Sequence, residues 1–394
     1  MEWLNYWEDE DFKCHGHPEP HARAQYLLYT CKDLRWHVKI LFLGELIRNN
    51  ISNELIERQK SKSTRRRELQ DLIKHISLQG VSLIENTVTE IRVQYSKGFF
   101  PVGTLPLPLV NEASTLSTHN AYQAFTYRLC YSVKEDPNRV IYPEFFKDTL
   151  STPLLYFSKL KELAPATKLV YIKSEKKNYV FKAIDRPLYQ AQDSAMVEKE
   201  IQNLQLLSPC PAIVELHSVV RSPCPYYTGR LEEPKIVVRG FLMEYYERGS
   251  IQDILDQHTQ IAWQKWPLQI ATGLQHLHIH GITHMDLKPS NVMVDHNGDA
   301  KLIDLSGMAT TAEWTAPELR KCLDPTLQPW TTRVRHDIWA FGMLVWILLK
   351  FNESGEGPLF ELVKNTTKEN PEHRISLDTV LLELWNLAQS KSTS

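Results

Sequence analysis

The sequence predicts an α+β fold with a small strand-rich lobe, a larger helical lobe and an N-terminal accessory domain. Three observations predict this arrangement. Strand-like segments dominate residues 155–245, helix-like segments dominate the residues that follow, and the polar motif His-Met-Asp-Leu-Lys-Pro-Ser-Asn begins at His284. We therefore expect an accessory domain in residues 1–150 and a two-lobed domain in residues 155–390.

In the accessory region, residues 51–76 are rich in helix formers and carry apolar residues at helical spacing, which predicts one or more amphipathic helices. Residues 87–95 and 124–133 alternate β-branched or aromatic residues with polar ones, which is typical of strands. The region contains no motif that indicates a chemistry. We expect a helical or α+β domain, and its position in the chain suggests that it docks an unidentified protein.

In the second region, residues 168–184 predict two strands joined at a polar turn. A helix is expected over residues 194–207, and strands are expected near residues 213–220 and 235–245. The following elements are a helix over 263–278 and a short hairpin around Asn297-Gly298. The apolar stretch 338–349 is too short for a membrane span, which needs about twenty residues, so it predicts a buried helix.

Charge and cysteine content restrict the possible partners and compartments. Lys plus Arg number 45 and Asp plus Glu number 47, so the net charge of −2 gives no electrostatic reason to expect nucleic acid or a membrane as partner. The basic run 60–67 is compatible with a nuclear-localisation signal or with a solvated helix face or loop, and we favour the second. The acidic N-terminus does not predict a signal peptide. Six scattered cysteines fit a reducing compartment, so we expect a cytoplasmic or nuclear protein.

Four residues between positions 286 and 304 supply the groups that phosphoryl transfer needs. Asp286 and Asp304 offer carboxylates, Lys288 an ammonium group and Asn291 an amide. The segment resembles the protein-kinase catalytic loop H-R-D-L-x-x-x-N followed by the metal-binding D-F-G. The resemblance implies that Asp286 is the catalytic base, that Asn291 and Asp304 bind Mg²⁺, and that Lys288 neutralises the γ-phosphate as in serine/threonine kinases.

Upstream residues extend the resemblance to the nucleotide. Tyr179-Val180-Phe181-Lys182 is similar to V-A-I-K, which implies that Lys182 contacts the α- and β-phosphates of ATP. Its helix partner is Glu200 or, as a competing assignment, Glu198, and the pattern E-I-x-x-L favours Glu200. Residues 241–246 resemble the strand that leads into the kinase hinge. The other expected nucleotide-binding residues are Met243 as gatekeeper, Glu244 and Tyr246 through their backbone, and Val170, Val180 and Met293 as apolar walls.

Two downstream motifs resemble structural supports of the same family. Thr-Ala-Glu-Trp-Thr-Ala-Pro-Glu is similar to T-x-x-Y-x-A-P-E, and Asp-Ile-Trp-Ala-Phe-Gly is similar to D-x-W-x-x-G. The resemblance implies that Thr311 bonds to the base and to the lysine two residues after it. It further implies that Asp337 accepts backbone N–H bonds from the catalytic loop and that Glu318 forms a buried ion pair with Arg374.

The chain departs from the family in the loop that covers the phosphates. Aligning Val170 with the valine of G-x-G-x-x-G-x-V places Leu163, Pro165 and Lys168 at the three glycine positions. Glycine permits close backbone approach and proline removes an N–H donor, so this loop should hold ATP less well.

The activation segment departs as well. Met285 replaces the arginine of H-R-D, which in many kinases is neutralised by a phosphorylated activation loop, and only three residues separate Gly307 from Thr311. Switching by phosphorylation of this loop is therefore not expected. Ser306 stands at the glycine position of D-F-G, with Gly307 one residue later.

Our interpretation is an ATP-dependent serine/threonine protein kinase that transfers the γ-phosphate of ATP to protein hydroxyls with Mg²⁺. The alternative is a pseudokinase that acts as a nucleotide-dependent or nucleotide-independent binding or scaffold module, and the missing glycines and short activation segment motivate it. A third possibility is a small-molecule phosphotransferase, against which Lys288 and the Ala-Pro-Glu motif argue.

Overall fold

The computed structural model describes residues 1–14, 19–44, 60–96, 100–108, 110, 129–144, 153–164, 169–186, 189–230, 233–259, 262–352 and 357–392. The chain forms two compact units. Unit 1 contains Met1–Arg139 together with Pro223–Ile236, and unit 2 contains Val140–Ser222 together with Val237–Ser394. Each unit is described by itself.

Unit 1 is built on a six-stranded sheet with the strand order β1-β2-β3-β4-β6-β5. Its strands are β1 (Glu2–Glu8), β2 (Ala22–Cys31), β3 (Leu34–Leu43), β4 (Val88–Tyr95), β5 (Leu105–Pro106) and β6 (Leu129–Glu135). β3 and β4 are parallel, and the other neighbouring strands are antiparallel. The strand predicted over 87–95 is thus present as β4. β6 covers the described part of the other predicted strand, whose residues 124–128 lie outside the described residues.

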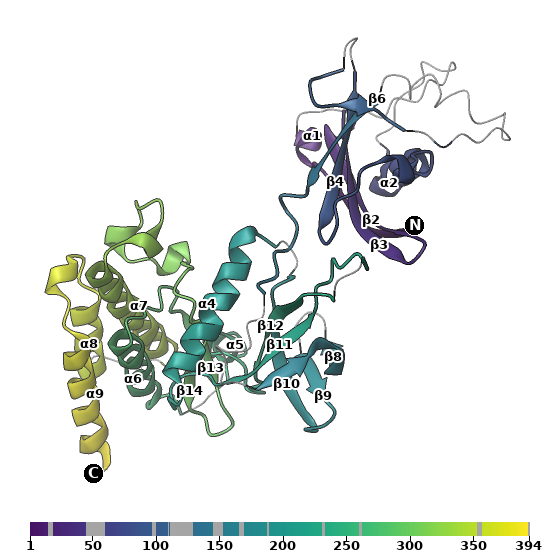
Figure 1. Cartoon of the computed structure of the whole chain (residues 1–394). Coiled ribbons are helices and arrows are strands. Elements are labelled where there is room, and N and C mark those ends of the chain that lie inside the picture. Colours follow the sequence, from purple (N-terminus) through teal and green to yellow (C-terminus); the bar gives the residue numbers. More distant parts are fainter. Residues whose placement is uncertain are drawn as a thin grey trace. The chain divides into compact units, whose positions relative to one another are not determined.

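In the described part of unit 1, the α-helices α1 (Asp11–Cys14) and α2 (Lys62–Lys74) accompany this sheet (Figure 1). α2 begins after Ser61, whose hydroxyl accepts a hydrogen bond from the backbone N–H of Thr64 at 3.2 Å. Its apolar residues Leu69, Leu72 and Ile73 are buried in the core of the unit with side chains of the sheet. The helix predicted within residues 51–76 is present as α2, and residues 51–59 lie outside the described residues.

The basic run 60–67 enters α2 and is engaged by carboxylates rather than simply solvated. Arg65 is 3% exposed and pairs with Glu8 at 2.6 Å. Lys60 contacts Glu19 at 2.7 Å and Glu68 at 3.2 Å. The expectation of a solvated helix face was therefore wrong for Arg65, because its guanidinium ties α2 to the end of β1.

A segment from the middle of the chain completes unit 1. Thr228 lies in the connection Pro223–Ile236 and is 2% exposed. Its N–H donates to Asn86 Oδ1 at 3.0 Å, and its hydroxyl oxygen accepts from Asn86 N–H at 2.8 Å. This arrangement could not be predicted from the sequence, since a reciprocal contact between residues 142 positions apart leaves no periodic pattern.

Unit 2 begins with a second six-stranded sheet, in the order β7-β11-β12-β10-β9-β8. Its strands are β7 (Leu154–Tyr156), β8 (Leu160–Ala164), β9 (Leu169–Ile172), β10 (Lys177–Ala183), β11 (Leu216–Pro223) and β12 (Ile236–Glu244), and helix α4 (Ala191–Leu207) follows β10. The antiparallel pair β9–β10 is the predicted hairpin. The predicted helix and the later two strands are also present.

The rest of unit 2 is mainly helical (Figure 1). It comprises α5 (Ile251–Asp256), α6 (Trp266–Ile279), α7 (Trp330–Phe351), α8 (Pro358–Thr366) and α9 (Leu377–Ser392), with the antiparallel strands β13 (Val292–Val294) and β14 (Ala300–Leu302) between α6 and α7. Trp266 donates its indole N–H to the carbonyl of Gly298 at 2.9 Å, which fixes α6 against the predicted Asn-Gly turn. The two-lobed α+β arrangement is confirmed.

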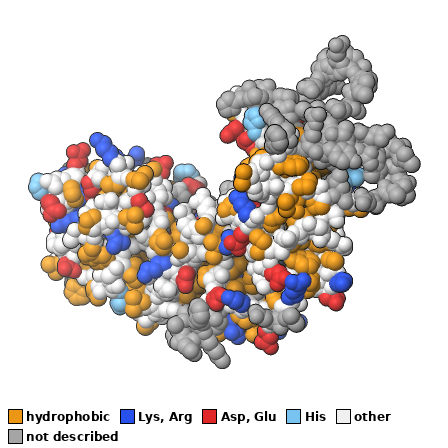
Figure 2. Space-filling model, turned by 45° about the horizontal axis from the view of Figure 1, so that its top comes forward, with side chains coloured by type: hydrophobic (Ala, Val, Ile, Leu, Met, Phe, Trp, Pro, Cys, Tyr) orange, Lys and Arg blue, Asp and Glu red, His pale blue; other side chains and the backbone are white. Residues whose placement is uncertain are grey.

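The stretch 338–349 lies inside the buried helix α7, where its side chains join those of α6 and α8 in one core. Among the described residues, no helix is long and apolar enough to span a bilayer. On the face drawn in Figure 2, acidic and basic side chains of the described residues are interspersed, as a nearly neutral composition would suggest.

Candidate active site

The loop between α6 and β13 brings Asp286, Lys288 and Asn291 together. Lys288 Nζ lies 2.7 Å from Asp286 Oδ2. Asn291 donates from Nδ2 to the Asp286 carbonyl at 2.8 Å and to its Oδ2 at 3.0 Å. Asp286 Oδ1 is buried and has no hydrogen-bond partner among the described residues. One carboxylate oxygen is therefore fixed by the loop, and the other has no hydrogen-bond partner among the described residues.

Asp337 on α7 holds this loop through hydrogen bonds from the loop backbone. It is fully buried, and its carboxylate accepts the backbone N–H groups of His284 at 2.8 Å and Met285 at 2.9 Å. His278 Nε2 adds a third contact at 2.9 Å. Burial opposes the charge on Asp337, but its contacts outweigh burial, foremost the hydrogen bond from His278, so the pKa of Asp337 lies below its ordinary value. The backbone contact predicted for Asp337 is present.

Lys182 on β10 joins two carboxylates from different elements. Its Nζ lies 2.5 Å from Glu200 Oε2 on α4 and 2.5 Å from Asp304 Oδ1 after β14. Burial disfavours the charged lysine, but Glu200 and Asp304 overcome this effect and raise the pKa of Lys182 above its ordinary value. Partial burial likewise opposes the charge on Asp304, and Lys182 lowers the pKa of Asp304 below its ordinary value. Glu200, rather than the exposed Glu198, is thus the helix partner.

The donor set at this centre fits a divalent cation held together with phosphate. The bonds given by Asn291 use its amide nitrogen, which leaves its amide oxygen as a hard ligand. Asp304 has one oxygen on Lys182 and a side chain that is 43% exposed. Within the described ranges, no group of three or more His, Cys, Asp or Glu side chains could hold a metal. A cation here would therefore depend on these two side chains and on oxygens that a phosphorylated substrate brings. Mg²⁺ usually binds in this way and not in a site made of protein ligands alone.

A family model described as the protein kinase domain matches residues 166–375, which is more than half of the chain. The chain belongs to this family. A protein kinase domain implies ATP as a substrate and, typically, a divalent metal.

Three curated kinases illustrate the similarity. Mitogen-activated protein kinase kinase kinase 13-B of Xenopus laevis is 33% identical over 123 residues, which cover 27% of this chain and 12% of the relative. Mitogen-activated protein kinase kinase kinase 13 of Homo sapiens is 32% identical over the same length, with the same coverage. Mitogen-activated protein kinase kinase 1c of Physcomitrium patens is 28% identical over 184 residues, covering 42% of this chain and 47% of the relative. The match thus spans about an eighth of the length of the first two relatives.

In this kinase domain, four expected nucleotide-binding residues lie on the adjoining strands β9, β10 and β12, whereas Tyr246 follows β12 and Met293 lies on β13. β10 pairs with β12 so that Val180 faces Met243 in register and Tyr179 faces Glu244. Met243 and Tyr246 are both 7% exposed, and their side chains belong to the main core of unit 2. Val180 and Met293 are partly buried against the same core. Val170 pairs with Tyr179 rather than with Val180 and is buried in a separate cluster on the other face of the sheet, so its expected place as an apolar wall beside Val180 was wrong. Pro165 and Lys168, at two of the absent glycine positions, lie outside the described residues.

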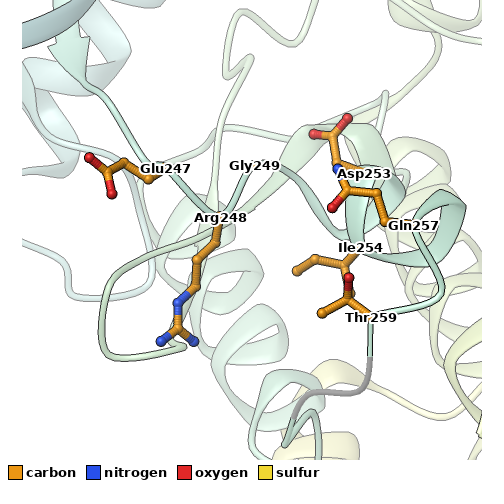
Figure 3. A pocket seen from close by; sticks show the side chains of 7 residues that line it. All are labelled: Glu247, Arg248, Gly249, Asp253, Ile254, Gln257 and Thr259. Atoms are coloured by element: carbon orange, nitrogen blue, oxygen red, sulfur yellow. The ribbon is translucent and has the colours of Figure 1, made fainter.

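A depression of about 430 Å³ adjoins the hinge of the kinase domain. Figure 3 shows its lining residues: Glu247, Arg248, Gly249, Asp253, Ile254, Gln257 and Thr259. The carboxylate of Asp253 caps α5 by accepting the backbone N–H and the hydroxyl of Ser250, both at 2.7 Å. Sequence reasoning did not identify this depression, because its walls come from a loop and a short helix that carry no motif.

The short activation segment is held to the catalytic loop and to the helical lobe. Thr311 Oγ1 accepts from Lys288 Nζ at 2.6 Å, whereas no direct bond from Thr311 to Asp286 is found among the described residues. Of the two bonds expected for Thr311, the bond to Lys288 is therefore present. Glu318 accepts two bonds from the Arg374 guanidinium, at 2.6 and 2.7 Å, as predicted.

The shifted glycine after Asp304 has a structural reason. Gly307 adopts φ +67°, and a Cβ there would lie 2.7 Å from the carbonyl oxygen of Thr283. Ser306 is 7% exposed, and its hydroxyl accepts the N–H of Met308 at 3.3 Å. The backbone thus needs glycine at position 307, while position 306 accommodates a small polar side chain.

Proposed function

We propose that this chain is an ATP-dependent serine/threonine protein kinase that transfers the γ-phosphate of ATP to hydroxyl groups of proteins. One observation carries the proposal. Lys182 bridges Glu200 and Asp304 at 2.5 Å each. The separate loop of Asp286, Lys288 and Asn291 lies in the same unit. One carboxylate oxygen of its candidate base has no partner among the described residues. Because phosphoryl transfer depends on positioning and charge stabilisation, this collection of groups suits that reaction.

In the proposed step, Asp286 orients the acceptor hydroxyl and takes its proton through Oδ1. The hydroxyl oxygen forms a bond to the γ-phosphorus, and the bond to the β-phosphate oxygen breaks, so that ADP leaves. Lys288, at 2.7 Å from Asp286, can reach both the base and the transferred group. A lysine two residues after the base supports serine and threonine as acceptors.

Asn291 and Asp304 are the proposed ligands of Mg²⁺, which when bound would neutralise charge on the nucleotide phosphates. Lys182, oriented by Glu200, is proposed to contact the α- and β-phosphates. Adenine is proposed to bond to the backbone of the hinge. The proposed contacts there are the backbone groups of Glu244 and Tyr246, the gatekeeper Met243 and the apolar residues Val180 and Met293.

The test is incorporation of labelled phosphate from ATP into protein substrates. General-base catalysis predicts that Asp286→Ala lowers the rate by about 10²- to 10⁴-fold. Asp378→Ala on α9 is the control, since Asp378 is exposed and bonds only to Gln275 among the described contacts. Equal rates for wild type and Asp286→Ala would show that the base is assigned wrongly.

The pseudokinase alternative makes a different prediction for the same protein. At about 100 times its dissociation constant, Mg²⁺-ATP should stabilise a nucleotide-binding fold by about 2.7 kcal/mol. Thermal stabilisation without any labelled product would favour a nucleotide-dependent binding module. Absence of both would favour a scaffold that binds no nucleotide.

Further proposals concern partners and compartment. Unit 1 is proposed to dock an unidentified protein, and neither nucleic acid nor membrane is proposed as a partner. All six cysteines are free thiols, which supports cytosol or nucleus as the compartment. Affinity capture with the tagged full chain, followed by imaging of the same tag, tests both proposals.

A further inference from the structure

His336 immediately precedes Asp337 on α7 and belongs to none of the sequence motifs. Its side chain is 1% exposed. Nε2 lies 2.8 Å from the carbonyl oxygen of Met285, and Nδ1 lies 3.2 Å from the backbone nitrogen of Ala316. A carbonyl can only accept and a backbone N–H can only donate, so Nε2 carries the proton and Nδ1 is the acceptor. These two contacts define a neutral imidazole in a single tautomer.

The contact to Met285 restrains the residue directly before the candidate base. Met285 has φ +65°, a left-handed conformation that is uncommon for a residue with a side chain. Asp337 Oδ1 accepts its N–H at 2.9 Å, and His336 Nε2 donates to its carbonyl. Two consecutive residues of α7 therefore hold the peptide groups on both sides of the Met285 Cα. This grip fixes the direction in which the chain enters Asp286.

The contact to Ala316 restrains the far end of the activation segment. Ala316 is fully buried and opens the Ala-Pro-Glu motif. The adjacent Thr315 donates its hydroxyl to the carbonyl of Thr311 at 2.9 Å, and Thr311 in turn accepts from Lys288. The imidazole of His336 and this chain of contacts thus join the activation segment to the catalytic loop at two places.

The side chain of Met285 explains why such a link would matter here. It is 1% exposed and carries no charge, so it cannot bind a phosphorylated activation loop. We propose that His336 is a positioning residue that locks the catalytic loop to the end of the activation segment, which makes assembly of the site independent of loop phosphorylation. This inference rests on the proposed kinase function.

Three substitutions separate the two bonds of His336. His336→Phe keeps a planar ring and removes both bonds. His336→Asn places an amide oxygen near the position of Nδ1 and can keep the acceptor for Ala316. His336→Gln reaches further and can keep the donor to Met285. His280→Asn is the matched control, because this partly buried histidine at the C-cap of α6 bonds to the carbonyl of His276 in that helix at 2.8 Å.

Enzyme kinetics supply the first readout. Because His336→Phe leaves the buried carbonyl of Met285 and the buried N–H of Ala316 without their His336 partner, we expect it to lower kcat/KM for a peptide substrate by about 5- to 150-fold. The KM for ATP should change little. His336→Gln should recover most of kcat, because Met285 positions the base. His336→Asn should recover most of the peptide KM, because Ala316 belongs to the activation segment. Equal losses in all three variants, or a parallel rise in KM for ATP, would overturn the positioning role.

Hydrogen–deuterium exchange of the full chain supplies a readout that does not depend on activity. The Ala316 amide should exchange about 5- to 150-fold faster in His336→Phe and His336→Gln, while His336→Asn and the control retain protection. Unchanged Ala316 exchange in every variant would overturn the inference while leaving the kinase proposal intact. A wild-type protein that transfers no phosphate would overturn the proposed function, and the exchange pattern would then decide the His336 link alone. If His336→Phe does not fold, the two amide variants carry the same comparison.

Discussion

Removing the charge of Glu318 should destabilise unit 2 far more than removing an exposed carboxylate. The Arg374 side chain is 0% exposed and donates two bonds to Glu318, at 2.6 and 2.7 Å. Glu318→Gln would leave a buried guanidinium without its counter-charge. Breaking a buried ion pair in this way typically costs about 3 to 5 kcal/mol.

The surroundings of Arg374 narrow this range. Its guanidinium also donates to the carbonyls of Lys368 at 2.8 Å, Arg335 at 3.1 Å and Glu369 at 3.3 Å. These bonds survive in Glu318→Gln, so we expect the lower end, about 3 kcal/mol. Unit 2 has roughly 240 residues, a size at which each kcal/mol lowers Tm by about 2–4 °C. The expected loss in Tm is therefore about 6–12 °C.

Scanning calorimetry of the full chain measures this loss in the transition of unit 2. The control is Glu361→Gln on α8, where Glu361 is 65% exposed and pairs with Lys364 at 2.8 Å. An exposed pair of this kind contributes at most about 1 kcal/mol. If Glu318→Gln and Glu361→Gln lowered Tm equally, the reasoning from burial would be refuted.

Three further predictions concern other charged groups. Glu200→Gln should lower kcat by about 10- to 100-fold, because Lys182 loses the partner that orients it. Glu198→Gln, on the exposed face of α4, should leave kcat unchanged. Equal rates for the two variants in a labelled-phosphate assay would contradict this prediction. The pKa of Asp337 is lowered in the folded protein, so its charge stabilises the fold fully above the ordinary carboxyl pKa of about 4, and this stabilisation is lost as pH falls through the folded pKa. In urea unfolding, the difference in stability between wild type and Asp337→Asn should therefore shrink below about pH 4. A difference that stays constant with pH would contradict this prediction. In unit 1, Lys39→Met should lower the free energy of unfolding in urea by about 3 to 5 kcal/mol, because Lys39 bonds at 2.8–2.9 Å to two carboxylates that are almost fully buried. A loss under about 1 kcal/mol would contradict this account.

The catalytic motifs were predictable because their spacing is local. Asp286, Lys288 and Asn291 lie on one loop, so their mutual distances follow from a few backbone angles. The pairing of Lys182 with Glu200 could be predicted only through the family resemblance, since β10 and α4 meet through tertiary packing. Thr311 shows the limit of this reasoning, because the structure gives it one of its two expected partners.

The accessory region was the least predictable part of the chain. Its α2 and β4 follow clear periodic patterns and were anticipated, whereas β1, β2 and β3 were not. β2 and β3 run side by side for ten residues each, and their central residues are buried on both faces near the middle of the sheet, which removes the alternation that identifies a strand. Arg65 was misjudged because a buried ion pair cannot be distinguished from a solvated charge in sequence alone.

The amino-acid sequence by itself determined the family, the order of strands and helices in the second region, and the chemical groups near the candidate base. These features depend on residue type and on short spacings, which the linear chain records directly. Only the tertiary structure decided that residues 223–236 complete unit 1, that Gly307 meets the Thr283 carbonyl, and that His336 bonds to both Met285 and Ala316. Each of these is a contact between segments brought together by packing, and burial makes each hydrogen bond or close approach specific to the folded chain.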